Sequence, residues 1–139
     1  MNSFVLDASV ALAWFVDDPP PAFAVQIQRF VEGGIKAIVP TLWTLEMANG
    51  FCMAERRGKL TADQTDHGLR QLEIIIVSGI QISAEVASIR EHLATARAFQ
   101  LTAYDAVYLE LARREGLPLA TLDRGLRTAA AKAGVALMK

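Results

Sequence analysis

Residues 4–16 read FVLDASVALAWFV, and this stretch decides the fold. Phe4, Val5 and Leu6 form a short apolar run that is typical of a buried strand, and a helical pattern of apolar residues follows from Ser9. Asp7 stands between the two patterns. Because the run has no basic leader and carries an acid in its middle, we interpret it as a strand that enters a helix and not as a signal peptide.

The same alternation of short apolar runs and longer helical patterns continues along the chain. Strands are expected at 4–6, 37–39, 79–82, 119–121 and, as a fifth, 135–138. Helices are expected at 9–16, 22–32, 42–57, 62–77, 84–99, 104–115 and 125–133. Strands that are separated by helices pair in parallel through crossover connections. We therefore predict an α/β fold of three layers, α/β/α, with a central and mostly parallel sheet of four to five strands.

Composition and charge limit the classes of protein to which this chain can belong. The 139 residues are 53% hydrophobic, so that we expect residues 1–139 to form a single domain around one core. Cys52 is the only cysteine, which excludes an internal disulfide; we expect it to be buried as a small hydrophobe, in a reducing cytoplasm. The net charge of -1 argues against nucleic-acid binding by bulk charge alone. The uncharged stretch 74–84 is too short to span a bilayer, so no membrane insertion is expected.

Two acids come directly after predicted strands. Asp7 follows the first strand, and Asp123 follows the apolar run 119–122. Each also stands where a helix begins, so that a simple N-cap is the alternative interpretation for both. In open α/β sheets, however, ligands bind beyond the carboxyl ends of the strands. This edge of the sheet is therefore where we expect the chemistry.

Two further acids lie within predicted helices. Asp105 comes three residues after Thr102, in a spacing that also fits a capping box. Glu46 lies among core-type residues of the helix 42–57, and a buried carboxylate needs a partner. If these two acids converge with those at the strand ends, the four repel one another unless a cation offsets their charge. Oxygen ligands suit Mg²⁺ or Mn²⁺, and such a site predicts hydrolysis of phosphodiester bonds.

Four segments carry a resemblance to a known family. They are VLDASVALAW (5–14), PTLWTLEMANGF (40–51), LTAYDAVYLELA (101–112) and LATLDRGL (119–126). They resemble the motif blocks of the PIN-domain family, in the same order, and most of all those of the VapC toxins of bacterial VapBC toxin–antitoxin pairs. The resemblance extends from Phe4 to about Leu137.

This resemblance implies a Mg²⁺- or Mn²⁺-dependent endoribonuclease. It assigns Asp7 and Asp105 as direct metal ligands, and Glu46 and Asp123 as the acids that complete the pocket. The residues that it implies as supporting hydrogen-bonding groups are Ser9, Asn49 and Thr121. It also implies a homodimer and a cognate VapB-type antitoxin that covers the active site. Because such antitoxins bind the operon DNA themselves, no direct DNA binding is expected of this chain.

Some cationic and aromatic residues are candidates for RNA contacts. Arg124 and Arg127 follow Asp123 at a helix N-terminus, where the helix dipole disfavours cations, and we hypothesise that they hold RNA phosphates. A solvated helix face is the alternative. Tyr104 is a candidate for stacking on a base, although an aromatic residue at a helix start also packs locally.

Four other residues are expected to have structural roles only. His67 and His92 have no metal-ligand spacing to each other and are expected at the surface. Trp14 and Trp43 stand in apolar patterns and are expected in the core or at a dimer surface.

Other classes of protein also place acids at strand ends. A phospho-receiver domain would carry an acidic pair after its first strand and a lysine at the end of a late strand, but Asp7 stands alone and 119–123 contains no lysine. A haloacid-type phosphatase would carry Asp-x-Asp, which Asp7-Ala8-Ser9 does not supply. A non-catalytic binding partner with the same fold stays open as the alternative.

Overall fold

The computed structural model describes residues 2–85 and 87–139, and strands alternate with helices along them. The elements in chain order are β1 (Ser3–Leu6), α1 (Ala8–Val16), α2 (Ala22–Glu32), β2 (Lys36–Pro40), α3 (Leu42–Arg56), α4 (Ala62–Gly79), β3 (Ile80–Ser83), α5 (Ile89–Phe99), α6 (Ala103–Glu115), β4 (Leu119–Ala120) and α7 (Arg124–Ala133). No helix among the described residues is both long and apolar enough to cross a membrane.

The four strands form one parallel sheet in the order β3-β2-β1-β4. Val5 of the central strand β1 pairs with Ile38 of β2 on one side and with Leu119 of β4 on the other. The carboxyl ends of all four strands therefore meet at one edge of the sheet.

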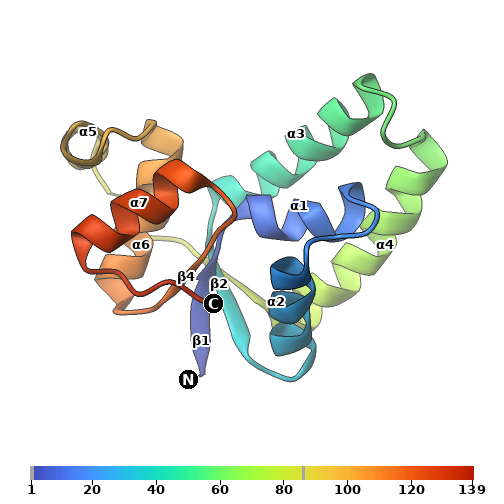
Figure 1. The fold of residues 1–139 in the computed structure, drawn as a ribbon, viewed down its shortest axis with the longest axis horizontal. Helices are drawn as coiled ribbons and strands as arrows, with labels where there is room; N and C mark the ends of the chain where they lie inside the picture. The colour runs from blue at the N-terminus through green and yellow to red at the C-terminus, as the bar shows by residue number, and fades with distance from the viewer. Residues whose placement is uncertain (1, 86) are drawn as a thin grey trace.

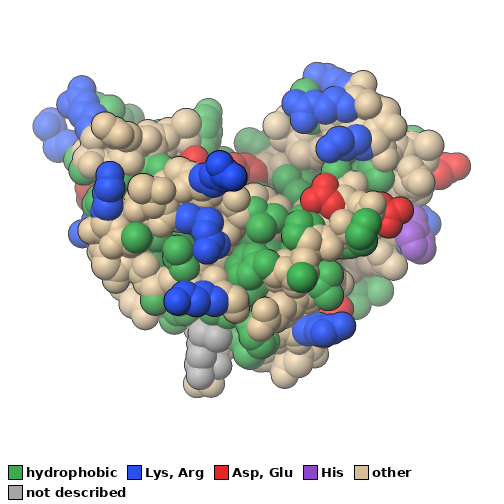
Figure 2. Space-filling model, viewed as in Figure 1, with side chains coloured by type: hydrophobic (Ala, Val, Ile, Leu, Met, Phe, Trp, Pro, Cys, Tyr) green, Lys and Arg blue, Asp and Glu red, His purple; other side chains and the backbone are tan. Residues whose placement is uncertain are grey.

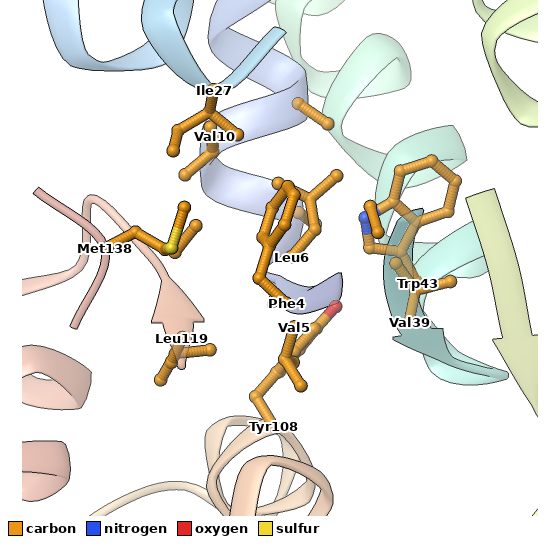
Figure 3. Close-up of a cluster of buried hydrophobic side chains, with 14 of the residues drawn as sticks. Phe4, Val5, Leu6, Val10, Ile27, Val39, Trp43, Tyr108, Leu119 and Met138 are labelled. Atoms are coloured by element: carbon orange, nitrogen blue, oxygen red, sulfur yellow. The ribbon is translucent and has the colours of Figure 1, made fainter. Parts of the chain in front are cut away.

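Helices cover both faces of the sheet, which confirms the predicted three-layer fold (Figure 1). Phe4 and Leu6 point from β1 toward α1 and α2, where they meet Val10 and Ile27 (Figure 3). Side chains alternate along a strand, so Val5 points to the opposite face, where α6 packs. These side chains are all completely buried. The packing of these side chains in the core therefore fixes the point at which β1 ends, and with it the position of Asp7, the next residue.

Two predicted elements differ from the structure by more than two residues in extent. The predicted helix 84–99 was too long, since α5 begins at Ile89 and Ser88 caps it by accepting a hydrogen bond from the Glu91 N–H (3.1 Å); Val86 lies outside the described residues. The predicted fifth strand 135–138 is reduced to a single parallel bridge between Leu119 and Leu137.

The structure also differs from the prediction in the burial of two residues. Cys52 is exposed, because α3 buries the other side, which carries Trp43, Met47 and Phe51. His92 is half-buried and contacts Glu110, whereas His67 lies at the surface as expected. Both tryptophans, Trp14 and Trp43, lie in the core.

Candidate active site

Four acidic side chains from four different elements line one cavity of about 670 Å³. Asp7 follows β1, Glu46 lies in α3, Asp105 lies in α6 and Asp123 precedes α7. The cavity lies beyond the carboxyl ends of β1 and β4, where open α/β sheets bind their ligands. Figure 2 shows acidic side chains in the hollow between the lobes that carry α7 and α3. The fold therefore brings together all four acids that the sequence singled out.

Asp7 is the most deeply buried of these acids, with 5% of its surface exposed. Its Oδ2 accepts hydrogen bonds from Ser9 Oγ and from Thr121 Oγ1, both at 2.7 Å. Asp7 is the N-cap residue of α1 by position, but its side chain makes no capping hydrogen bond, so capping does not explain its carboxylate. Burial raises the pKa of Asp7, the two hydroxyl donors oppose this, and the charge of Asp123 adds to it.

The two hydroxyl groups also tie the end of β1 to the loop after β4. Ser9 Oγ accepts from the Leu122 N–H at 3.0 Å, and Thr121 Oγ1 accepts from the Asp123 N–H at 3.0 Å. Each hydroxyl has a single proton, which it donates to Asp7, so the 3.5 Å between the two oxygens is not a hydrogen bond. Ser9 and Thr121 thus orient Asp7 and place Asp123 beside it.

Glu46 has a partner that the sequence analysis did not identify. The hydroxyl of Tyr108, a completely buried residue of α6, donates a hydrogen bond to Glu46 Oε1. Tyr108 lies three residues after Asp105, on the same side of the helix, and a buried tyrosine hydroxyl needs an acceptor. This spacing in the sequence could have indicated that Tyr108 belongs to the site.

The pKa values of this pair move in the same direction. Burial raises the pKa of Glu46, and the charges of Asp7 and Asp105 raise it further, although the bond from Tyr108 lowers it. Burial and the bond to Glu46 raise the pKa of Tyr108, so that its hydroxyl keeps its proton.

Of the other two acids, Asp105 and Asp123, only Asp123 caps a helix with its side chain. Burial, followed by the charges of Asp123 and Asp7, raises the pKa of Asp105 to about 6. The N–H of Asp105 donates to Thr102 Oγ1 at 3.1 Å, which confirms that Thr102 caps α6. Asp123 caps α7 through Oδ1, which accepts from the Leu126 N–H at 2.8 Å. Asp123 is therefore both an N-cap and a lining residue of the cavity.

Of the remaining candidate residues, Asn49 and Tyr104 line the cavity, whereas Arg124 and Arg127 do not. Asn49 lines it and is exposed, without a hydrogen bond to any of the acids in the described part of the chain. Arg124 is exposed at the start of α7, whereas Arg127 donates to the carbonyl of Thr121 at 3.1 Å. Tyr104 is 64% exposed at the mouth of the cavity.

The acids suit a hydrated divalent ion better than a cage made of protein ligands. Within residues 2–85 and 87–139, no three acidic, histidine or cysteine side chains lie close enough together to enclose a metal ion. Mg²⁺, however, keeps several of its waters and binds through one or two carboxylates. The pKa values of Asp7, Glu46 and Asp105 are all raised, and a nearby cation would offset the repulsion that contributes to this.

The comparison with known families decides the identity of this fold. The sequence profile of the PIN domain matches residues 4–132. The chain belongs to the PIN-domain family. This PIN domain is 33% identical over 123 residues to Ribonuclease VapC3 of Pyrobaculum aerophilum, and the match covers 88% of this chain and 90% of that relative. These matches confirm the resemblance to VapC-type PIN domains that the four motif segments predicted.

A solved structure agrees with this assignment. The crystal structure of PAE2754 from Pyrobaculum aerophilum superposes on this PIN domain with a TM-score of 0.67 and 25% sequence identity. The match covers 91% of this chain and 78% of that one. The three-layer α/β/α fold is therefore shared with a protein of the same organism as the ribonuclease.

Proposed function

We propose that this PIN domain is a Mg²⁺- or Mn²⁺-dependent endoribonuclease and the toxin of a VapBC-type toxin–antitoxin pair. The observation that carries the proposal is the convergence of four acids from four elements in one cavity of a chain related to Ribonuclease VapC3. Such an enzyme would act in the cytoplasm, where its RNA substrates are.

In this proposal Asp7 and Asp105 hold the metal ion, and Glu46 and Asp123 complete the acidic pocket. The bound ion would stabilise charge on the phosphodiester and make a water molecule more acidic. Ser9 and Thr121 direct both their protons at one oxygen of Asp7, which leaves Oδ1 for the ion. Tyr108 occupies Oε1 of Glu46, so that Oε2 remains available to accept a proton.

Residues that line the cavity or lie in the helix after Asp123 are candidates for RNA contacts. Arg124 is exposed beside Asp123 and would hold a phosphate near the acids. Arg127 holds the loop through the Thr121 carbonyl and keeps further N–H donors for a phosphate. Tyr104 offers an exposed ring for stacking on a base, and Asn49 offers an exposed amide that also lines the cavity.

Exposed apolar side chains support the two proposed protein partners. Leu45 is 68% exposed at the mouth of the acidic cavity, where a VapB-type antitoxin would cover the site. A second group is exposed on α4, β3 and α5, namely Ile74, Val77, Ile82, Ile89 and Leu93. We propose that this second group contributes to the homodimer surface, because its side chains lie on the edge strand β3 and on the helices that come before and after it.

Induction in cells tests the ribonuclease directly. The wild-type chain and Asp7→Asn are induced for minutes, and total RNA is sequenced from its 5′ ends. New ends that appear only with the wild type are expected, and their positions name the substrate. If soluble wild-type protein without its antitoxin produces no new ends, the non-catalytic binding partner is the better account.

A further inference from the structure

The acidic cavity continues into a groove between α1 and α3. A neighbouring cavity of about 250 Å³ shares three lining residues with it, Ser9, Leu12 and Gly50. Gly50 has no side chain that could close the passage between the two cavities. The walls of the second cavity include the apolar side chains of Leu12 and Val16 from α1 and of Met53 from α3. We call this second cavity the α1–α3 groove.

Two cations line the far end of the α1–α3 groove. Arg57 is the C-cap residue of α3, and Lys59 lies in the turn that follows. Gly58 between them has a φ of 75°, and the Lys59 N–H donates to the carbonyl of Ala54 at 2.9 Å. This left-handed turn folds the chain back over the end of the helix, so that both cations border the same groove.

The charges of these two side chains are not balanced within the protein. Arg57 and Lys59 are exposed, and neither forms an ion pair with any acid that the structure describes. Asp17 also lines this end of the groove, but the cations outnumber it and it is paired with neither. The dipole of α3 favours a cation at its C-terminus, which accounts for Arg57 but not for Lys59, which lies beyond the helix. Unpaired cations at the end of a groove are suited to a phosphate.

Cations lie on both sides of the acids. Figure 2 shows Lys and Arg side chains over α3 on one lobe and over α7 on the other, with acidic side chains in the hollow between them. Glu46 and Arg57 lie about 16 Å apart along α3, from the rise per residue of an α-helix. This length matches roughly five nucleotides of a stacked strand. A strand with one phosphate at the acids would therefore reach Arg57 within a few nucleotides.

We propose that the α1–α3 groove binds the RNA strand on one side of the cleavage site, and that Arg57 and Lys59 hold one of its phosphates. The inference rests on the proposed ribonuclease function. A divalent ion bound at the acids would attract the phosphate to be cleaved, and the two cations attract a second phosphate at the other end of the groove. RNA is favoured over a protein segment because the same negative charge then suits both ends.

The salt dependence of RNA binding tests this inference without any need for cleavage. The probe is a fluorescein-labelled oligouridine of about 12 nucleotides, within the range of single-strand sites, and the protein carries Asp7→Asn so that the probe is not cut. Arg57→Gln and Lys59→Gln are each expected to weaken binding about two- to fivefold. Each is also expected to reduce the slope of log K against log salt by about 0.7, as one lost contact to a single-strand phosphate requires.

Arg56→Gln is the matched control for these two variants. Arg56 is the neighbour of Arg57, is also exposed and loses the same charge, but it does not line the groove. Its slope is expected to equal that of the parent protein. A change in long-range charge would affect all three variants alike, so only a contact within the groove separates them.

The outcomes distinguish this inference from the proposed function. If the Asp7→Asn protein binds no oligouridine, or if Arg57→Gln and Lys59→Gln behave like Arg56→Gln, the groove is contradicted as an RNA site, even when the wild type cleaves RNA. Weaker binding of a VapB-type antitoxin by those two variants would then assign the groove to the protein partner. If the slopes change as expected and the wild type cleaves no RNA, the groove stands and the ribonuclease proposal fails.

Discussion

Thr121 makes two hydrogen bonds in the core of the site, and this gives a stability prediction. It is completely buried, donates to Asp7 and accepts from the Asp123 N–H. Thr121→Val keeps the shape of the side chain but removes both bonds and leaves a backbone N–H without a partner. We expect a loss of about 1–3 kcal/mol in the free energy of unfolding, measured in urea.

The control for that measurement is Thr121→Ser, which keeps the hydroxyl. It is expected to lose only the burial of one methyl group, about 1 kcal/mol. Equal losses for the two variants would show that the hydroxyl of Thr121 does not hold the acids.

Asp105 predicts how stability depends on pH in the absence of metal. Its pKa rises from 3.8 to about 6 in the folded protein, so between these values the folded state binds more protons than the unfolded state. The free energy of unfolding is therefore expected to fall as the pH rises from about 4 to about 6. The raised pKa values of Asp7 and Glu46 act in the same direction.

Asp105→Asn removes the titrating group and is expected to make this fall smaller. Urea unfolding in a chelating buffer, at intervals between pH 4 and 7, measures both proteins. A wild-type free energy of unfolding that rises over this interval, or equal slopes for the two proteins, would contradict the assignment.

Three of the four acids were recognisable from their local position, but the bonds between them were not. Asp7 and Asp123 follow strands, and Asp105 follows a capping threonine, all of which short sequence patterns reveal. The bond between Tyr108 and Glu46 joins residues 62 positions apart, so only the tertiary fold, which brings these two side chains of α6 and α3 together, creates it. The i, i+3 spacing of Asp105 and Tyr108 places both on one side of α6, but it does not identify Glu46 as the partner of Tyr108.

At the scale of elements, the contact between α2 and α4 depends on a residue without a side chain. A Cβ atom on Gly79, the last residue of α4, would lie 2.4 Å from Val31 Cγ1. Val31 is buried and β-branched, so it has little freedom to turn away. Gly79→Ala is therefore expected to destabilise the fold by about 1–3 kcal/mol.

A double-mutant cycle with Val31→Ala isolates this clash. Removing the methyl group that collides should make the cost of Gly79→Ala smaller in the Val31→Ala background. Thermal or urea unfolding of the four proteins gives the coupling. Additive losses would show that the two helices do not meet through these side chains.

The two elements that were predicted least well are α5 and the segment 135–138. In each, the apolar pattern favoured an element that is longer than the one in the structure. Ser88 and Glu91 carry the spacing of a capping box, which marks the start of α5 more precisely than the apolar pattern that extended it back to residue 84. The segment 135–138 is apolar enough for a strand, but it meets β4, which has only two residues, and forms a single bridge. The length of a strand depends on its partner, which the sequence of one segment cannot show.

At the scale of the whole molecule, we predict self-association from the exposed apolar side chains of the helices that flank the edge strand β3. Strand β3 ends the sheet, and Val77 and Ile89 in the helices before and after it are 87% and 86% exposed. If this surface joins two copies, Val77→Lys or Ile89→Lys should convert the dimer into a monomer, because each would bury an unpaired charge. Sedimentation analysis measures the oligomeric state.

Leu45→Lys is the matched control, because Leu45 is also exposed and apolar but lies at the acidic cavity. It is expected to leave the dimer intact. A wild-type chain that remains monomeric at all concentrations would exclude this surface as a homodimer contact.

The most direct test of the central claim, that the acidic cavity is a metal-dependent ribonuclease centre, is RNA cleavage by the purified protein. The wild type, Asp7→Asn and the control Asp66→Asn, an exposed acid of α4, are compared with Mg²⁺ and with a chelator. We predict that the wild type and Asp66→Asn cleave only with Mg²⁺, and that Asp7→Asn loses at least a hundredfold in rate, as expected when a charge-stabilising group is removed. Cleavage by Asp7→Asn at the wild-type rate, or equal cleavage in the chelator, would contradict the account.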